Sequence, residues 1–377
     1  MDGLSYRPDS LETLAQAFAR GAAAHDREGS FPHENFAALH KAGLLGLTVR
    51  PQEGGEGAGL PRAVAVVRAI GRGCPATALV LAMQFIQHQA IARSAGWPEH
   101  LRVLLGRGAV ERGELVNALR VEPELGTPAR GGLPATTLRR TPEGWRLNGR
   151  KIYSTGAPAL SWMLVWCRTE EAEPRTGIAL VPAGAAGLRI EESWDQAGLR
   201  ASGSHDVVFE EVLLPLDHAI DFRPPAAWGR PDAEQVAWNT LLIAALYTGV
   251  AQAARDWLLD FLRQRAPASL GAPLATLPRM QEAVGRIEAL LLANDRLVAD
   301  AARRESMAVS DYGLIKTLAA ENAIAVVQQA VALCGNHALA RANPLERHLR
   351  DVLCARIHTP QPDSAWLAAG RAALGLA

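Results

Sequence analysis

The sequence predicts an α+β protein in which helical domains at both ends enclose a β-domain. Apolar residues recur at helical spacing in the first hundred residues and again after Pro231, whereas between Leu115 and Pro215 they alternate with a period of two. A chain of 377 residues also exceeds what one hydrophobic core usually supports. We therefore expect a helical domain at 1–114, a β-domain at 115–225 and a helical domain at 226–377.

The N-terminal part contains stretches with the periodicity of amphipathic helices. They lie at residues 11–26, 36–47, 60–73 and 76–96. One long loop, PQEGGEGAGLP at residues 51–61, interrupts them. Its glycines indicate tight turns rather than a phosphate cradle, because no strand precedes the loop.

The middle part alternates as half-buried strands do. Strands are expected at 144–155, 162–169, 176–183 and 205–215, separated by Gly, Pro and Asn turns. We expect them to form a compact, barrel-like β-domain.

Helical periodicity returns in three long segments near the C-terminus. These segments cover residues 238–264, 279–305 and 314–335, and shorter tail helices follow. Their lengths suit a four-helix bundle.

Composition argues against several classes of function. The formal net charge is +0 and the arginines are dispersed among acidic residues, so a nucleic-acid partner is not expected. Four widely spaced cysteines form no metal-ligand pattern and suggest buried thiols in a reducing compartment. The first residues lack the basic and apolar pattern of an export signal, and the apolar runs fall short of a membrane span. We expect a cytoplasmic protein with no metal and no membrane association.

Four patterns occur in order at the spacing of one protein family. They are LVNALRVEPELGTPARGG (115–132), NGRKIYSTGA (148–157), GLRASGSHDVVFEEVLLP (198–215), and ALCGNHAL (332–339) followed by LERHLRDVLCARIH (345–358). Together they resemble the acyl-CoA dehydrogenase superfamily over essentially the whole chain. The resemblance implies that fold, a non-covalently bound flavin between the β-domain and the bundle (usually FAD, with FMN as the alternative), and a homotetramer or homodimer.

The resemblance also implies cofactor-binding residues. Tyr153 takes the aromatic place and Thr155 the hydroxyl place beside the flavin ring. Strand alternation would point both side chains to one face, although an aromatic residue and a threonine are also ordinary strand residues. Arg265 takes the place of an arginine that reaches the pyrophosphate of a neighbouring subunit's FAD, although a helix-terminal arginine also suits the helix dipole. Gly335 and Asn336 lie where family glycines let the backbone approach the dinucleotide, but His337 departs from that pattern.

The carboxylate base of the acyl-CoA dehydrogenases is missing from both of its usual places. Counting on from Arg350 and Asp351, the tail position holds Thr359, and the alternative position at the start of the long helix holds Asn239. Neither side chain can remove an α-proton at neutral pH. Nearby Glu234 is a candidate substitute in a shifted register, although a glutamate near a helix N-terminus usually complements the helix dipole.

His358 precedes Thr359 and matches a histidine of the flavin-dependent monooxygenase branch, which is dibenzothiophene monooxygenase-like. Those enzymes use reduced flavin and oxygen on small organic substrates, and a separate flavin reductase is then a candidate partner. Thr155 and His88 are the further catalytic candidates. A hydrogen-bonded core residue is an equal interpretation of His358 and the favoured one of His88. A monooxygenase is the favoured interpretation. An acyl-CoA dehydrogenase with a non-standard base and a non-catalytic paralogue are the alternatives.

Overall fold

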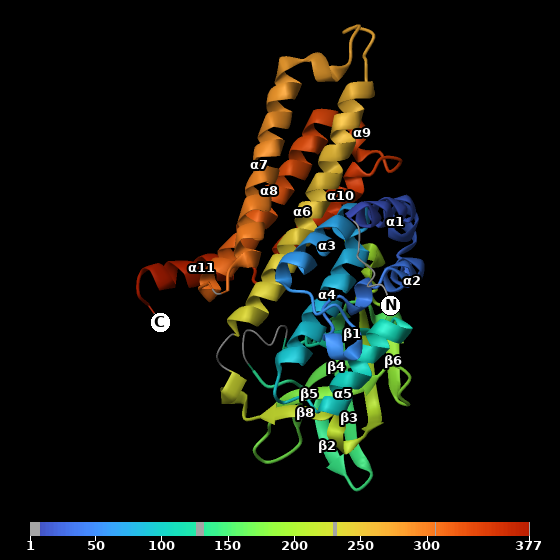
Figure 1. Ribbon diagram of the computed structural model, residues 1–377, viewed down its shortest axis with the longest axis vertical. Helices are drawn as coiled ribbons and strands as arrows, with labels where there is room; N and C mark the ends of the chain where they lie inside the picture. The colour runs from blue at the N-terminus through green and yellow to red at the C-terminus, as the bar shows by residue number, and fades with distance from the viewer. Residues whose placement is uncertain (1–7, 126–131, 229–231, 306, 377) are drawn as a thin grey trace.

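The computed structural model describes residues 8–125, 132–228, 232–305 and 307–376. Its elements run from helices through strands to helices, as expected, and form an elongated molecule with the β-domain at one end (Figure 1). The class of element changes from helix to strand between Arg112 and Leu115, and back to helix between Trp228 and Ala233.

The N-terminal helices pack between the sheet and the C-terminal bundle. They are α1 (Pro8–Glu28), α2 (His33–Lys41), α3 (Leu60–Gly73), α4 (Pro75–Arg93) and α5 (Glu99–Arg107). Helix α4 is apolar on nearly all sides because it contacts strand β1 on one side and helix α6 on the other. It therefore joins the β-domain to the bundle.

The β-domain is one eight-stranded sheet. Its strands are β1 (Leu115–Leu119), β2 (Thr137–Thr141), β3 (Gly144–Ser154), β4 (Leu160–Thr169), β5 (Thr176–Pro182), β6 (Leu188–Glu191), β7 (His205–Leu214) and β8 (Ala219–Arg223). The order is β6-β7-β3-β2-β4-β5-β8, with β1 paired to β4. Strands β1 and β2 run parallel to β4, and the other pairs are antiparallel. Strand β3 thus lies inside the sheet, between β7 and β2, and its end carries the NGRKIYST motif.

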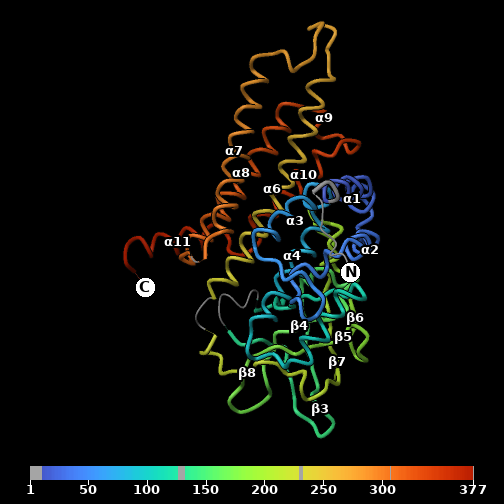
Figure 2. The backbone as a smooth tube through the Cα atoms, viewed as in Figure 1, coloured from blue at the N-terminus to red at the C-terminus, as the bar shows by residue number. Residues whose placement is uncertain are grey.

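Three long helices and one short helix form the C-terminal bundle. The helices of this part are α6 (Ala233–Gln264), α7 (Pro278–Arg303), α8 (Val309–Cys334), α9 (Asn336–Leu339), α10 (Leu345–Leu353) and α11 (Pro362–Ala373). Helices α6, α7 and α8 pack on one another, and α10 packs on α6 and α8. Figure 2 shows the connection between α6 and α7 at the end of the molecule farthest from the β-domain.

Two of these helices are long and apolar enough to cross a membrane by length and composition alone. They are α6 and α8, and 78% of the most apolar window of α6 and 50% of that of α8 is buried inside the protein. The apolar sequence of α6 is accounted for by its contacts with α3, α4, α8 and α10.

Candidate functional site

The end of strand β3 presents Tyr153 and Thr155 in a geometry that differs from the expected alternation. Strand β3 ends at Ser154, and Tyr153 adopts a left-handed backbone with a φ of 56°. The predicted strand alternation is therefore wrong at this point, because the chain turns sharply, with the amide of Thr155 donating to the carbonyl of Tyr153 at 2.9 Å. A left-handed tyrosine is strained by about 1–3 kcal/mol, and such strain is common at functional sites.

The two side chains remain available to a ligand. The Tyr153 side chain is 56% exposed, and its ring meets the edge of Trp194 at a centroid distance of 6.1 Å. The Thr155 hydroxyl hydrogen-bonds the Ser204 hydroxyl at 3.0 Å, and its carbonyl accepts from the Asn117 side-chain amide at 2.9 Å. An exposed ring and a positioned hydroxyl therefore lie two residues apart in the chain.

A buried ion pair joins two of the four sequence patterns. Glu122 of the first pattern and Lys151 of the second are both buried, with 2.6 Å between Oε1 and Nζ. Burial by itself would raise the pKa of Glu122, but hydrogen bonds from Lys151 and Thr136 outweigh it and hold that pKa below its usual value. The pair ties the chain after β1 to β3. Residues 126–131 of the first pattern lie outside the described residues.

His358 lies on the turn after α10 and contacts helix α6. Its Nδ1 is 2.8 Å from the hydroxyl of Tyr247, which is fully buried. Burial, together with the charge of Lys316, lowers the pKa of His358 to about 4, and burial raises the pKa of the Tyr247 hydroxyl well above its usual value. Both groups are therefore uncharged at neutral pH. Sequence reasoning missed Tyr247, whose only signal is a hydroxyl within the apolar run LLIAALYTGV.

No carboxylate occupies the two places where the base was sought. Thr359 is exposed beside His358, and Asn239 is partly buried on α6. Glu234 is paired with Arg93 at 2.9 Å and accepts from the Gln89 amide at 2.6 Å, and it lies in the first turn of α6. These contacts, together with its place in the first turn of a helix, explain the presence of Glu234 without a catalytic role.

His88 and His358 hydrogen-bond to different elements of the fold. It is buried on α4 and bonds Gln84, whose side chain in turn bonds the backbone of Leu45, Glu114 and Val116. Burial lowers the pKa of His88 to about 4. The contacts of His88 therefore lie toward β1 and the N-terminal loops, whereas those of His358 lie toward α6 and α8. The grouping of His88 with Thr155 and His358 stays a prediction.

Arg265, Gly335 and Asn336 lie at the far end of the bundle. Arg265 ends α6, about 27 Å along the helix from Tyr247 at 1.5 Å per residue. Gly335 ends α8 with a φ of 56°, and His337 next to Asn336 packs on Phe261 of α6 at 5.2 Å. Among the described residues no carboxylate pairs with the exposed Arg265. These three residues lie near one another but away from Thr155 within one chain.

Arg350 and Asp351 bind other residues rather than each other. Arg350 binds Asp26 of α1 at 2.6 Å and Glu346 at 2.9 Å. Asp351 is buried and accepts the amide of Leu199 at 2.7 Å, and burial raises its pKa to about 6. Both residues therefore fix α10 to neighbouring elements.

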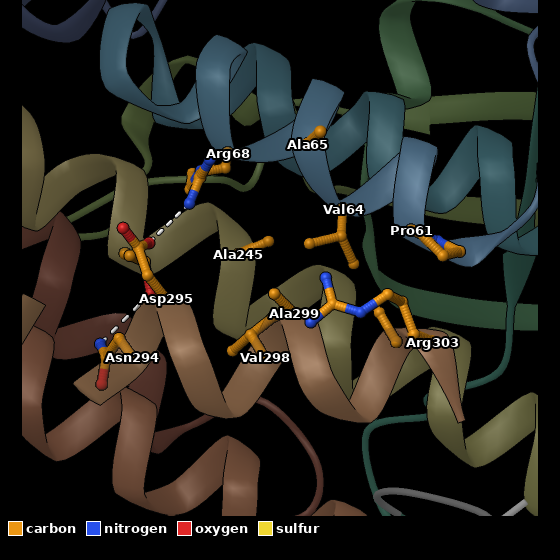
Figure 3. Close-up of a pocket in the computed structure, with 12 residues that line it drawn as sticks. Pro61, Val64, Ala65, Arg68, Ala245, Asn294, Asp295, Val298, Ala299 and Arg303 are labelled. Atoms are coloured by element: carbon orange, nitrogen blue, oxygen red, sulfur yellow. Dashed lines mark hydrogen bonds and ion pairs between the residues drawn. The ribbon is translucent and has the colours of Figure 1, made fainter. Parts of the chain in front are cut away.

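A cavity of about 210 Å³ lies elsewhere, between α3, α6 and α7 (Figure 3). The Arg68–Asp295 pair closes one side of it, and Arg303 points across Val298 and Ala299. None of the site residues predicted from the sequence lines this cavity. Within the described ranges no group of three His, Cys, Asp or Glu side chains could hold a metal ion.

Comparison with known proteins identifies the family. The N-terminal, middle and C-terminal domain models of the acyl-CoA dehydrogenases match residues 9–96, 121–212 and 241–361. The chain belongs to the acyl-CoA dehydrogenase superfamily. Its cofactor is accordingly a flavin, and its fold is the α+β fold expected from the sequence.

The relatives of this superfamily member differ in their named activities. The chain is 33% identical to YdbM of Bacillus subtilis, which is provisionally named an acyl-CoA dehydrogenase, over 95% of this chain and 93% of that protein. It is 31% identical to the amino sugar nitrososynthase DnmZ of Streptomyces peucetius, over 91% of this chain and 86% of that protein. The structure of KijD3 with FMN and dTDP-3-amino-2,3,6-trideoxy-4-keto-3-methyl-D-glucose has a TM-score of 0.80 at 28% identity, covering 98% of this chain and 93% of that one.

The residues present fit a flavin. Tyr153 offers an exposed aromatic face that is held in a strained conformation, and Thr155 offers a partly buried hydroxyl two residues further along the chain. Arg265 offers an exposed guanidinium, of the kind that binds phosphate oxygens in pairs.

Proposed function

We propose that this protein is a flavin-dependent monooxygenase that oxidises a small organic substrate. One observation carries the proposal: Thr359 and Asn239 stand at the two places of the dehydrogenase base, while the uncharged ring of His358 is bonded to Tyr247 beside the first of them. A site without a carboxylate in these places lacks the group that removes an α-proton from a thioester.

The contacts of His358 define what its ring can do. When reduced, a bound flavin supplies the electrons for transferring one atom of O₂ to a substrate. Because the Tyr247 hydroxyl keeps its proton, it can donate to Nδ1 of His358, which leaves the ring proton on Nε2. Nε2 is then a neutral donor toward oxygen or substrate. The Thr155 hydroxyl, fixed by Ser204, provides a second donor.

The named relatives support a nitrogen-containing substrate and FMN. The names of two relatives, at 31% and 29% identity, describe nitrososynthases, one for an amino sugar and one for L-evernosamine, and the KijD3 structure contains FMN and an amino-sugar nucleotide. We include FMN beside FAD, a separate flavin reductase as electron source, and a homodimer or homotetramer. Assembly would let Arg265 of one subunit reach the flavin of another, since it lies far from Thr155 in its own chain.

The test combines oxygen labelling with an anaerobic control. The protein is loaded with chemically reduced FMN or FAD and mixed with ¹⁸O₂ and a panel of amino-sugar nucleotides, amines and thioethers. We expect one product to gain a labelled oxygen atom, and His358→Asn to lower its yield about tenfold or more without weakening flavin binding. Full activity of the variant would remove His358 from the reaction.

An acyl-CoA dehydrogenase remains the second candidate because of the likeness to YdbM. In this case an acyl-CoA added without oxygen should bleach the bound oxidised flavin. Such bleaching, together with no labelled product across the panel, would overturn the monooxygenase proposal. Failure of the protein to take up any flavin would contradict both enzymatic functions and leave the non-catalytic paralogue.

A further inference from the structure

Lys316 is a fully buried lysine whose ammonium group, among the described residues, hydrogen-bonds to backbone carbonyls. It lies on α8 with 0% exposure. Its Nζ donates to the carbonyl oxygens of Ala355 at 2.7 Å, His358 at 2.7 Å and Pro360 at 3.0 Å. These three bonds use all three donors of the ammonium group. The acceptors belong to one short segment, residues 355–360, which carries His358 and Thr359.

Burying the Lys316 ammonium group costs free energy of folding, so we expect its hydrogen bonds to hold a particular part of the structure in place. A buried ammonium loses its hydration, and here no carboxylate hydrogen-bonds to it among the described residues. The nearby Glu321 carboxylate is instead paired with Arg356 at 2.6 Å. Burial lowers the pKa of Lys316 to about 8, so the group is still mostly protonated at neutral pH. The compensation comes from the carbonyls at the end of the α10 turn, where the helix dipole favours a cation.

The segment is therefore held from two sides. Helix α8 holds its backbone through Lys316, and helix α6 holds the His358 ring through Tyr247. With the carbonyl of His358 fixed on one side and Nδ1 on the other, few orientations remain for the ring.

We propose that Lys316 is a positioning residue that holds segment 355–360 and thereby sets the placement of His358 in the site. The role of His358 rests on the proposed function, but the contact by which Lys316 holds the segment does not. We therefore expect that loss of the ammonium group loosens this segment in the flavin-free protein as well as in the flavin-loaded protein.

The test is hydrogen exchange and kinetics on the full-length protein with Lys316→Met and Lys316→Arg. In Lys316→Met, the amides of residues 356–359 and 361 should exchange about tenfold faster or more, with α7 unchanged. In the flavin-loaded protein kcat should fall about tenfold while KM stays within about twofold, because placement rather than binding is lost. Lys316→Arg, which keeps the charge, should recover part of both effects.

The matched control is Arg356→Gln, which breaks the exposed Arg356–Glu321 pair between the same two elements. It should change neither exchange nor kcat appreciably. If Lys316→Met does not fold, Lys316→Gln, which keeps two donors without the charge, takes its place. Unchanged exchange at 356–359 and 361 would overturn the holding role. Faster exchange with unchanged kcat would overturn the positioning role. If the wild type has no monooxygenase activity, the proposed function fails while the exchange result still decides the holding role.

Discussion

The hydroxyl of Tyr247 determines what the ring of His358 presents to the site. It occupies Nδ1, so only Nε2 is left for a substrate or for oxygen. The sequence could point to His358 and Thr359 because both follow the Arg350–Asp351 pair at a fixed distance. It could not point to Tyr247 or Lys316, because a polar residue within an apolar helix resembles core, and the Tyr247 partner lies 111 residues away.

Tyr247→Phe tests this contact at the residue scale. The variant keeps the buried ring but loses the hydroxyl, so the unfolding free energy should fall by only about 1 kcal/mol. We expect product formation to fall about tenfold, because the His358 ring loses its orientation and its tautomer preference. Turnover with labelled oxygen and flavin titration are the measurements. A large loss of flavin affinity at unchanged turnover of the loaded protein would contradict this role.

At the scale of elements, the length of a strand decided whether the sequence could predict it. Strands β3, β4, β5 and β7 have seven to eleven residues and were all expected. Strands β1, β2, β6 and β8 have only four or five residues, and β2 (TLRRT) is largely polar, so pairing with neighbours rather than local pattern defines them. The same limit hid the left-handed turn at Tyr153, because sequence alternation carries no information on a local reversal of φ.

Replacing Lys151 by methionine tests how the chain after β1 is attached to β3. The Glu122 carboxylate would stay buried without its cation, so the unfolding free energy should fall by about 3–5 kcal/mol. Flavin affinity should also fall, because β3 leads directly to Tyr153 and Thr155.

The control for this prediction is Arg150→Gln on the same strand. Arg150 pairs with Asp206 at an exposed position, so its loss should cost at most about 1 kcal/mol. Denaturant unfolding of both variants gives the comparison. Equal losses of unfolding free energy in the two variants would show that the buried Glu122–Lys151 pair stabilises the fold no more than the exposed Arg150–Asp206 pair does.

At the scale of the molecule, the two groups of cofactor-binding candidates lie in different parts of the fold. Thr155 follows strand β3 of the β-domain, whereas Arg265 and Gly335 follow the last residues of helices α6 and α8 in the bundle. Figure 2 shows the β-domain and the connection between α6 and α7 at opposite ends of the molecule. The fold class followed from the change of period along the chain. The distance between the two groups of candidates could not be predicted in this way, because it depends on how a helix of 32 residues is placed between the two ends of the molecule.

Buried histidines predict how the stability of the whole molecule depends on pH. Burial, with the Arg347 charge, lowers the pKa of His348 to about 3, and burial lowers that of His88 to about 4. Between about pH 6.5 and pH 4 the unfolded chain binds protons on these rings that the folded chain does not, so stability should fall as the pH falls. His358, whose pKa is also lowered to about 4, adds to this fall. Asp351, with its pKa raised to about 6, works in the opposite direction, but as one group against three.

His348→Gln isolates this effect, since the His348 ring is buried with Nδ1 lacking a hydrogen-bond partner in the structure. Denaturant unfolding of wild type and variant is compared from pH 7 to pH 4. Each unit of pKa shift corresponds to about 1.4 kcal/mol, so over this range the wild type should lose about 3 kcal/mol more than the variant. Carboxylate protonation acts on both proteins equally and cancels in the difference. Parallel stability curves would mean that the His348 ring already takes up a proton in the folded chain.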